Sequence, residues 1–149
     1  MATILLLSGP NLNLFGSRDP EVYGTDTLDE MVDDARRAAG EHGLDLEHLQ
    51  SNYEGAIVDA IQAARGRCDA IILNAGALTH YSFAISDALA AYDGVKVELH
   101  VSNPAAREEW RHTSMIAGVV DGTVAGFGRA GYRLAVEAVA AKLRTRTDR

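Results

Sequence analysis

The stretch TILLLS, residues 3–8, is apolar throughout its centre and leads directly into a polar segment, GPNLNLFGSRDPEVYG, at residues 9–24. A second run of the same kind, AIILN, occupies residues 70–74. Strands that are apolar on both faces are typical of a parallel sheet with helices packed on each side. The two runs therefore predict an α/β fold with a buried parallel sheet.

The same alternation of strand and helix patterns continues along the chain. The strand candidates are Thr3–Ser8, Leu44–Ser51, Ala70–Asn74, Val95–Ser102 and Gly122–Phe127. Between them, apolar residues recur with helical spacing in four segments, which begin at Leu28, Ile57, Ile85 and Val136. Five strands that alternate with helices predict a three-layer α/β sandwich with the flavodoxin-like strand order 2-1-3-4-5. We expect one domain over residues 1–149, with a loose tail at about 145–149.

Local signals mark the ends of the first helix. Thr27 and Glu30 have the spacing of a capping box, which predicts the start of the helix. Gly40 and Gly43 lie where the helix should end.

The composition is that of an acidic globular protein. The chain has 149 residues, 47% of them hydrophobic, and a formal net charge of −7, which gives no sign of a nucleic-acid surface or a patch for anionic membranes. Its one cysteine, Cys68, cannot form an internal disulfide and is expected to be a small buried residue at the entry to a strand. MATILLLSG lacks the basic leader of a signal peptide, and no apolar run approaches the ~20 residues of a membrane span. We therefore expect a soluble cytoplasmic protein.

The predicted topology indicates where a ligand should bind. In open parallel sheets, ligands bind beyond the carboxyl ends of the strands, at the point where the strand order reverses. Three segments with unusual polar residues follow the first, third and fourth strand candidates, at residues 9–24, 74–82 and 100–112.

Glu98 and His100 lie in the fourth strand candidate, two residues apart. The period of a strand places them on the same face, where a carboxylate stabilises the protonated imidazole and orients it as a general acid. An ordinary ion pair on an edge strand explains the two residues equally well.

The segment NAGALTH contains Asn74, Gly76 and His80. Gly76 permits a tight turn that leaves backbone N–H groups free to face an anion, and the Asn74 amide suits a carboxylate or hydroxyl ligand. The alternative is a turn with no ligand. Further along, Asp87 is either a solvated surface residue or a partner for an arginine.

Arg107 and Arg111 are four residues apart, so on a helix they share a face. Binding of an anion is one interpretation. Neutralisation by the adjacent Glu108 and Glu109 is the other.

Arg18 and Tyr23 lie five residues apart in the segment that follows the first strand. Free tyrosine, with a pKa near 10, is a poor base at neutral pH, but a guanidinium against the ring oxygen favours the phenolate. Tyr23 is then a candidate base and His100 a candidate acid, a pair that suits elimination or isomerisation next to a carbonyl.

Other classes of site fit the sequence less well. The histidines are scattered and do not have the spacing of metal ligands. Cys68 enters a predicted buried strand, which is not the surrounding of a catalytic nucleophile. GFGRAG at residues 126–131 matches a dinucleotide motif, but no further strand follows it, so its glycines are expected to turn the chain into the last helix. A response receiver needs an acidic cluster after the first strand, where Ser8 and Gly9 stand instead, and neither a receiver nor a flavin carrier explains Tyr23 together with His100.

Five segments, in order along the chain, carry motifs: GPNLNLFGSRDPEVYGTDTL, QSNYEGAIVDAI, NAGALTHYSFAISDAL, VELHVSNPAAREEWRHTS and VAGFGRAGYRLAV. Together they resemble the type II 3-dehydroquinate dehydratases, over a range from about Ile4 to Leu143. The resemblance implies a flavodoxin-like hydro-lyase that converts 3-dehydroquinate to 3-dehydroshikimate by anti elimination through an enolate, with no metal or organic cofactor. The reaction serves either aromatic amino acid biosynthesis or quinate breakdown.

The resemblance also implies a role for each catalytic residue. Tyr23 matches the base that removes a proton from the carbon beside the ketone. Arg18 matches the residue that promotes its phenolate form, and Asn11 matches the residue that holds a water near the enolate oxygen. His100 matches the acid that protonates the leaving hydroxyl, and Glu98 orients it.

The substrate-binding residues that the resemblance implies are Asn74, His80, Asp87, Val101, Ser102 and Arg111. Asn74 and the backbone of Val101 and Ser102 match a cradle for the substrate carboxylate, while His80 and Arg111 match groups that bind ring hydroxyls. Members of the family typically form homododecamers of four trimers, in which the aspartate that Asp87 matches comes from a neighbouring subunit. Arg107 is assigned only support of the site.

The chain departs from the usual family pattern at a few positions near these motifs: Tyr53, Ala75, Tyr81, Pro104 and Met115. None of these departures removes a group that transfers a proton.

Overall fold

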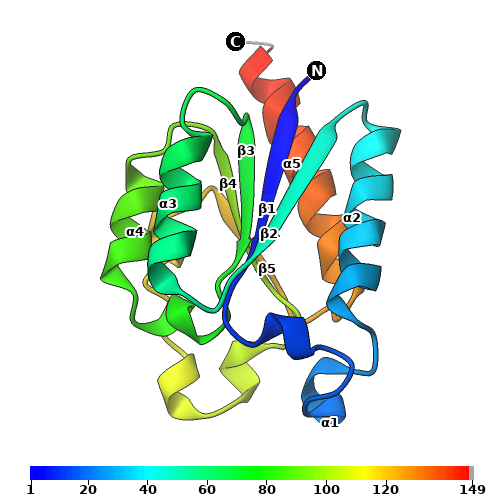
Figure 1. The fold of residues 1–149 in the computed structure, drawn as a ribbon, viewed down its shortest axis with the longest axis vertical. Coiled ribbons are helices and arrows are strands. Elements are labelled where there is room, and N and C mark those ends of the chain that lie inside the picture. Colours follow the sequence, from blue (N-terminus) through cyan, green and yellow to red (C-terminus); the bar gives the residue numbers. More distant parts are fainter. Residues whose placement is uncertain (148–149) are drawn as a thin grey trace.

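A five-stranded parallel sheet forms the centre of the computed structural model, which describes residues 1–147 (Figure 1). Its strands are β1 (Thr3–Ser8), β2 (Asp45–Gln50), β3 (Ala70–Asn74), β4 (Val95–His100) and β5 (Gly122–Ala125). Their order, β2-β1-β3-β4-β5, confirms the predicted topology. Strands β2, β4 and β5 are shorter than predicted because the chain turns away at their ends. In β4, His100 pairs with Ala125, whereas Val101 and Ser102 already lie in a bend.

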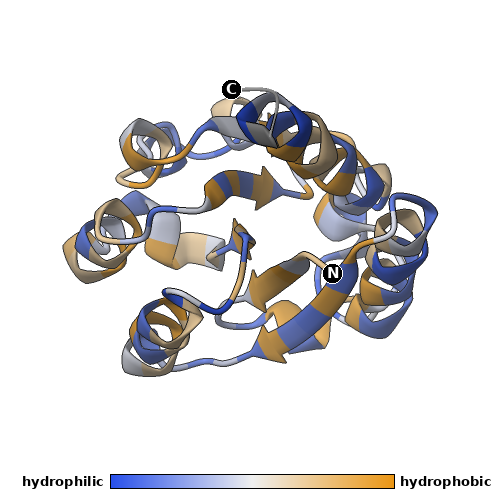
Figure 2. Cartoon of the chain, turned by 90° about the horizontal axis from the view of Figure 1, so that it is seen from above, coloured by the Kyte–Doolittle hydropathy of each residue, from blue (hydrophilic) through white to orange (hydrophobic). Residues whose placement is uncertain are grey.

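Two helices cover each face of the sheet. Helices α2 (Leu28–Glu41) and α5 (Ala130–Thr147) pack together on one face, and α3 (Glu54–Ala64) and α4 (Phe83–Ala90) pack together on the other (Figure 1). Alternate residues of each strand enter the two apolar cores: Ile4 and Leu6 face α2 and α5, whereas Leu5 and Leu7 face α3 and α4. Figure 2 shows hydrophobic residues along the central strands, alternating hydrophilic and hydrophobic bands on other strands, and mixed hydrophobic and hydrophilic residues around the helices. The central runs are therefore buried on both sides, as predicted.

The expected local signals lie at the helix ends. The Thr27 hydroxyl accepts from the backbone N–H of Glu30 at 3.2 Å, and the Glu30 carboxylate accepts from the backbone N–H of Thr27 at 3.3 Å, which confirms the capping box. Gly126 and Gly128, at φ +91° and +60°, turn the chain from β5 into α5. Helix α5 continues to Thr147, so residues 145–147, expected in a loose tail, are helical. Residues 148 and 149 lie outside the described part of the chain.

The three polar segments lie together at the carboxyl end of the sheet and contain short helices rather than open loops. The first holds η1 (Leu12–Leu14) and α1 (Pro20–Tyr23), and the second holds η2 (Gly76–His80). The third holds η3 (Pro104–Ala106) and η4 (Glu109–Arg111), and η5 (Ala117–Val119) follows before β5. Within residues 1–147, no helix combines the length and the apolar character needed to cross a membrane.

The first and second segments cross in close contact just beyond β1 and β3. The backbone N–H of Gly9 donates to the carbonyl of Asn74 at 2.8 Å. A Cβ at residue 9 would lie 2.5 Å from the carbonyl oxygen of Ala75, so only glycine fits at this crossing.

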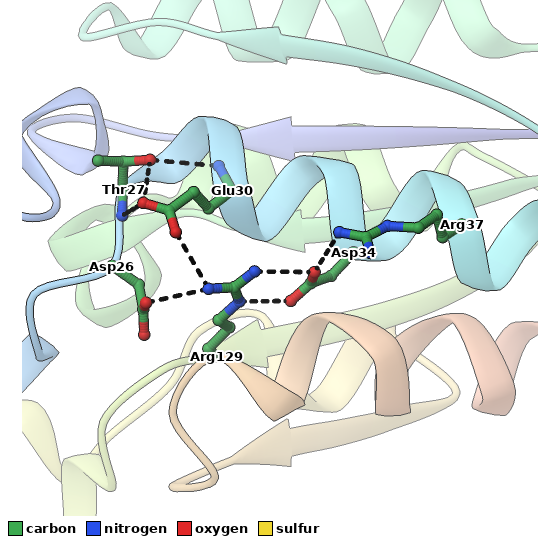
Figure 3. Close-up of polar contacts among 6 residues, drawn as sticks. All are labelled: Asp26, Thr27, Glu30, Asp34, Arg37 and Arg129. Atoms are coloured by element: carbon green, nitrogen blue, oxygen red, sulfur yellow. Dashed lines mark hydrogen bonds and ion pairs between the residues drawn. The ribbon is translucent and has the colours of Figure 1, made fainter.

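Arg129, directly before α5, binds carboxylates of α2 and of the residues that join the first polar segment to α2 (Figure 3). Its guanidinium donates to both carboxylate oxygens of Asp34 at 2.6 and 3.0 Å, to Asp26 at 3.0 Å and to Glu30 at 3.1 Å. The hydrogen bond from Arg129 lowers the pKa of the Asp34 carboxyl below its usual value. Because Asp26 directly precedes α2, this cluster fixes the point where residues 9–24 rejoin the fold.

Candidate active site

A cavity opens at the carboxyl end of the sheet, between the three polar segments. It measures about 540 Å³ when the part open to solvent is included, a size suited to a small organic molecule. Nine of the expected site residues line it: Asn11, Arg18, Tyr23, Asn74, His80, His100, Val101, Ser102 and Arg111. Segments far apart in the sequence therefore converge on one site, as the predicted topology requires.

Two expected residues do not line the cavity. Glu98 lies behind His100 and is buried. Asp87 is exposed on the surface of α4, so one subunit alone does not bring it to the site.

Glu98 and His100 form a buried pair on β4. The Nε2 atom of His100 lies 2.6 Å from a carboxylate oxygen of Glu98. Strand β4 lies between β3 and β5, so the alternative of an ion pair on an edge strand is wrong. An ionised carboxylate only accepts, so Nε2 carries a hydrogen and Nδ1 is the remaining ring nitrogen.

Three hydroxyl groups also hold the Glu98 carboxylate, and no pattern in the sequence predicted these contacts. Thr79 donates to it at 2.7 Å, Ser114 at 2.8 Å and Thr123 at 3.1 Å. Burial by itself raises the pKa of Glu98, but the hydrogen bonds from His100, Thr79 and Ser114 outweigh burial and lower the pKa to about 2. Glu98 is therefore an anion at neutral pH, and it fixes the orientation of the His100 ring.

Tyr23 lies against two arginines. The Nη2 atom of Arg18 donates to the Tyr23 hydroxyl at 3.4 Å, and the Arg18 guanidinium carbon lies 4.7 Å from the centre of the tyrosine ring. The guanidinium carbon of Arg107 lies 5.1 Å from the same centre. The sequence predicted the contact with Arg18 but not the one with Arg107, which comes from a different segment.

Arg107 and Arg111 both line the cavity. Their spacing would place them on one face of a helix, but the two residues do not lie on the same helix. Arg107 follows η3, donates to the Ser102 hydroxyl at 3.1 Å and lies 3.9 Å from the Glu108 carboxylate. Arg111 ends η4, donates to Glu108 at 3.0 Å and stacks over the ring of Trp110 at 4.0 Å. Glu108 thus pairs with both arginines, as the neutralisation interpretation predicts, and binding of an anion by them stays a prediction.

The side chain of Asn74 is buried at the floor of the cavity. Its Oδ1 atom accepts from the backbone N–H of Gly76 at 3.2 Å, and its Nδ2 atom donates to the Tyr132 hydroxyl at 3.4 Å. The Asn74 side chain therefore occupies the N–H of Gly76, and binding of an anion by other backbone N–H groups of this turn stays a prediction.

His80 and Asn11 complete the polar lining. The Nδ1 atom of His80 donates to the carbonyl of Thr113 at 2.7 Å, since a carbonyl only accepts, and this leaves Nε2 for a ligand. Asn11 is in the left-handed region at φ 70°, and its backbone N–H donates to the Asn52 side chain at 3.0 Å. Within residues 1–147, no group of three or more histidine, cysteine, aspartate and glutamate side chains is arranged to hold a metal ion.

The departures from the usual family pattern lie mostly away from the proton-transfer groups. Tyr53 and Tyr81 are exposed, and Ala75 is buried beside the Gly9 crossing. Pro104 lines the cavity, so it is the departure with a direct route to a bound ligand.

Comparison with known proteins identifies close relatives over nearly the whole chain. The family model described as dehydroquinase class II matches residues 2–140. The chain is 56% identical to the 3-dehydroquinate dehydratase of Ruegeria pomeroyi over 144 residues, which cover 96% of each protein. It is 55% identical to the catabolic 3-dehydroquinase of Penicillium rubens over 137 residues, which cover 92% of this chain and 88% of that protein.

A solved structure agrees with this similarity. The crystal structure of type II dehydroquinase from Butyrivibrio crossotus superposes with a TM-score of 0.90 at 41% identity, covering 93% of this chain and 97% of that one. The similarity therefore includes the fold as well as the sequence.

Proposed function

This chain belongs to the class II dehydroquinase family, and from that premise we propose that it is a lyase that dehydrates 3-dehydroquinate to 3-dehydroshikimate, with Tyr23 as base and His100 as acid. The observation that carries the assignment of roles is the arrangement of the two residues around one cavity. Tyr23 lies against arginines, and His100 is held by a buried carboxylate. A base and an acid of this kind suit an elimination next to a carbonyl.

The first step is removal of a proton by Tyr23. The positive charges of Arg18 and Arg107 beside the ring favour the phenolate oxygen, which takes a proton from the carbon next to the ketone. The electron pair of the broken C–H bond forms the double bond of an enolate. A water held by Asn11 donates a hydrogen bond to the developing enolate oxygen.

The second step is loss of water with His100 as the acid. When the enolate reforms the ketone, its electrons form the new carbon–carbon double bond and the C–O bond of the leaving hydroxyl breaks. Protonated Nδ1 of His100 gives its proton to that hydroxyl, which departs as water. The contact between Nε2 and Glu98 supports this role, because it stabilises the positive imidazolium and aims Nδ1 away from the carboxylate.

The remaining polar groups bind the substrate. Asn74 and the backbone of Val101 and Ser102 cradle its carboxylate, and His80 and Arg111 bind its ring hydroxyls. Free Nε2 of His80 suits a hydroxyl donor. This scheme uses acid and base groups alone, with no metal or organic cofactor.

The assembly is part of the proposal. We infer a cytoplasmic homododecamer of four trimers, in which Asp87 reaches the site of a neighbouring subunit. Its exposed position on α4 supports this role, because it is free to face another chain. One relative is named 3-dehydroquinate dehydratase and another catabolic 3-dehydroquinase. Aromatic biosynthesis and quinate breakdown are therefore both compatible with the proposed chemistry.

A direct assay tests the proposal. 3-Dehydroquinate is added to purified protein that has been treated with a chelator, and the ultraviolet absorbance of the conjugated enone product is followed. We expect a rise in the wild type and a loss of at least about a hundredfold in His100→Ala. The control is His42→Ala, which removes a histidine paired with Glu137 outside the cavity and is expected to retain activity.

Two results would contradict the proposal. Absence of turnover in the folded wild type would point to a related cyclic hydroxy-ketone acid as the substrate. Activity that depends on added divalent metal would replace the scheme with that of a metal-dependent lyase.

A further inference from the structure

The single tryptophan of the chain, Trp110, lies beside the cavity but is not among the residues that line it. It belongs to η4, which packs against η2, and 53% of the residue is exposed to solvent. Neither of the two apolar cores includes it. Its ring contacts two polar residues of the cavity wall, His80 and Arg111. A role at the cavity therefore explains this side chain better than a role in the core.

The contact between Trp110 and His80 is edge to face. The centres of the two rings lie 5.4 Å apart and their planes meet at 87°, an arrangement that aromatic pairs prefer. The imidazole is also anchored at Nδ1, which donates to the carbonyl of Thr113 at 2.7 Å. The hydrogen bond and the ring contact together hold the imidazole in one orientation, so Nε2 keeps one direction at the cavity wall.

The contact between Trp110 and Arg111 is a cation–π interaction. The guanidinium carbon of Arg111 lies 4.0 Å from the centre of the ring, and tryptophan is the aromatic residue that binds cations most strongly. The Nε atom of Arg111 donates to Glu108 at 3.0 Å, so the N–H groups of its two Nη atoms can serve a ligand. Only 14% of the arginine side chain is exposed. An arginine has many rotamers, and these two contacts select one of them.

We propose that Trp110 is a positioning residue that holds His80 and Arg111 in the orientations that bind the ring hydroxyls of the substrate. The inference rests on the proposed function, which assigns those hydroxyls to these two residues. Trp110 acts through its two neighbours, because it does not itself line the cavity. Its aromatic ring is the feature that the role requires, since an aliphatic side chain offers a guanidinium no electron-rich face.

Two substitutions of Trp110 test the role of the aromatic ring. Trp110→Leu removes the ring, and we expect it to raise KM by roughly three- to thirtyfold, as for the loss of a cation–π and an aromatic contact. The change in kcat should stay below about twofold, because the hydroxyl that leaves is served by His100 and not by the two positioned residues. Trp110→Phe keeps an aromatic face, and its KM should lie within about threefold of the wild-type value.

Tyr53→Leu is the matched control for these substitutions. It removes another exposed aromatic ring, which does not line the cavity, and it should leave KM unchanged. Thermal unfolding verifies that each variant is folded.

A mutant cycle tests whether Trp110 acts through its two neighbours. Trp110→Leu is added to a protein that already carries His80→Ala and Arg111→Ala, and kcat/KM is measured before and after. We expect a further loss of less than about twofold, because nothing remains for the tryptophan to position. A general structural role would give the same loss in this protein as in the wild type, and that result would contradict the proposal.

The fluorescence of Trp110 gives an independent measurement, because the chain has no second tryptophan. Tyr23→Phe protein, which lacks the proposed base, is titrated with 3-dehydroquinate, and the tryptophan emission is followed. We expect the emission to change with the dissociation constant that calorimetry gives, since the ligand binds the two groups that contact the indole. Constant emission while calorimetry records saturation would contradict the proposal.

The outcomes separate this inference from the proposed function. If the wild type turns over 3-dehydroquinate but Trp110→Leu has the same KM, the positioning role is wrong. It is also wrong if Trp110→Phe is no better than Trp110→Leu, or if Tyr53→Leu raises KM equally. If the wild type neither binds nor dehydrates 3-dehydroquinate, the proposed function fails instead.

Discussion

At the scale of single residues, the proposed chemistry depends on two side chains whose surroundings hold opposite charges. Tyr23 lies against the guanidinium groups of Arg18 and Arg107, and His100 is bonded to the carboxylate of Glu98. The charge that each neighbour carries is the one that stabilises the working form, a phenolate in one case and an imidazolium in the other. The surroundings therefore suit Tyr23 to the proposed role of base and His100 to the proposed role of acid.

Replacement of Tyr23 by Phe removes the proposed base and retains the ring that packs against Phe15. We expect turnover to fall by at least about a hundredfold while 3-dehydroquinate still binds. Initial rates and calorimetry on the same preparation measure the two effects. Tyr53→Phe, at an exposed position, is the matched control, and a fully active Tyr23→Phe protein would exclude tyrosine as the base.

The pKa of Glu98 predicts a pH-dependent contribution to stability. Its folded-state pKa of about 2 lies below the ordinary 4.5, so the unfolded chain takes up a proton first as the pH falls. The contribution is present above about pH 5 and is lost as the pH approaches 2. The shift corresponds to roughly 3 kcal/mol at neutral pH, of which roughly 2 kcal/mol is lost by pH 3.

Urea unfolding of the wild type and Glu98→Gln at pH 7 and pH 3 measures this contribution. The deficit of the variant should be larger at pH 7 than at pH 3. Asp59→Asn, at an exposed carboxylate, should show a small deficit at both pH values. An equal deficit for Glu98→Gln at the two pH values would contradict the assignment.

At the scale of elements, the segment 9–24 is held at both of its ends. Gly9 crosses Asn74 and Ala75 in close contact, and Arg129 binds Asp26 where the segment joins α2. The segment that carries the proposed catalytic residues is thus fixed to the body of the protein at both of its ends. The fixed ends explain how a chain with many glycines returns Tyr23 to the cavity.

Gly9→Ala tests the crossing. The new methyl group would lie 2.5 Å from a backbone carbonyl oxygen, so the two segments must separate. We expect a loss of roughly 1–3 kcal/mol in the free energy of unfolding, with a matching loss of activity because Asn74 and Asn11 move apart. Gly55→Ala is the control: it lies in α3 with nothing near its Cβ position, and it should be neutral or stabilising by up to ~1 kcal/mol. Equal stabilities for the two variants would show that the crossing is not tight.

At the scale of the whole molecule, arginines gather at the cavity although the net charge of the chain is negative. The chain has a formal net charge of −7, yet Arg18, Arg107 and Arg111 all line one cavity at the carboxyl end of the sheet. The cavity thereby concentrates guanidinium groups that suit the carboxylate of the proposed substrate, although Glu108 pairs with two of them.

The proposed assembly predicts that two inactive variants restore each other. Tyr23→Phe lacks the proposed base, and Asp87→Ala lacks the residue donated to the neighbouring site. When equal amounts are unfolded and refolded together, a site that combines an intact Tyr23 with an intact Asp87 arises in roughly a quarter of cases. We expect about that share of wild-type activity, from particles of about 190 kDa by light scattering for twelve chains of 15.9 kDa. Absence of recovery in assembled particles would mean that each site is built from one chain.

The sequence by itself determined the elements, their order and the position of the site. The apolar runs at 3–8 and 70–74 had to be central strands because both of their faces are apolar, and the capping box set the start of α2. Strand order then brought the ends of β1, β3 and β4 together, which is why nine expected residues share one cavity. These features follow from local periodicity and from the general rules of parallel sheets.

Only the tertiary structure decided which groups surround each functional side chain. The hydroxyls of Thr79, Ser114 and Thr123 meet at Glu98 from three separate segments, and Arg107 reaches Tyr23 across the cavity. The Tyr132 hydroxyl of α5 accepts from the Asn74 amide at the end of β3, a contact that no spacing in the sequence predicts. The physical reason is that the partners of a buried polar group are set by how helices and loops pack over the sheet, and that packing is a property of the whole fold rather than of any one segment.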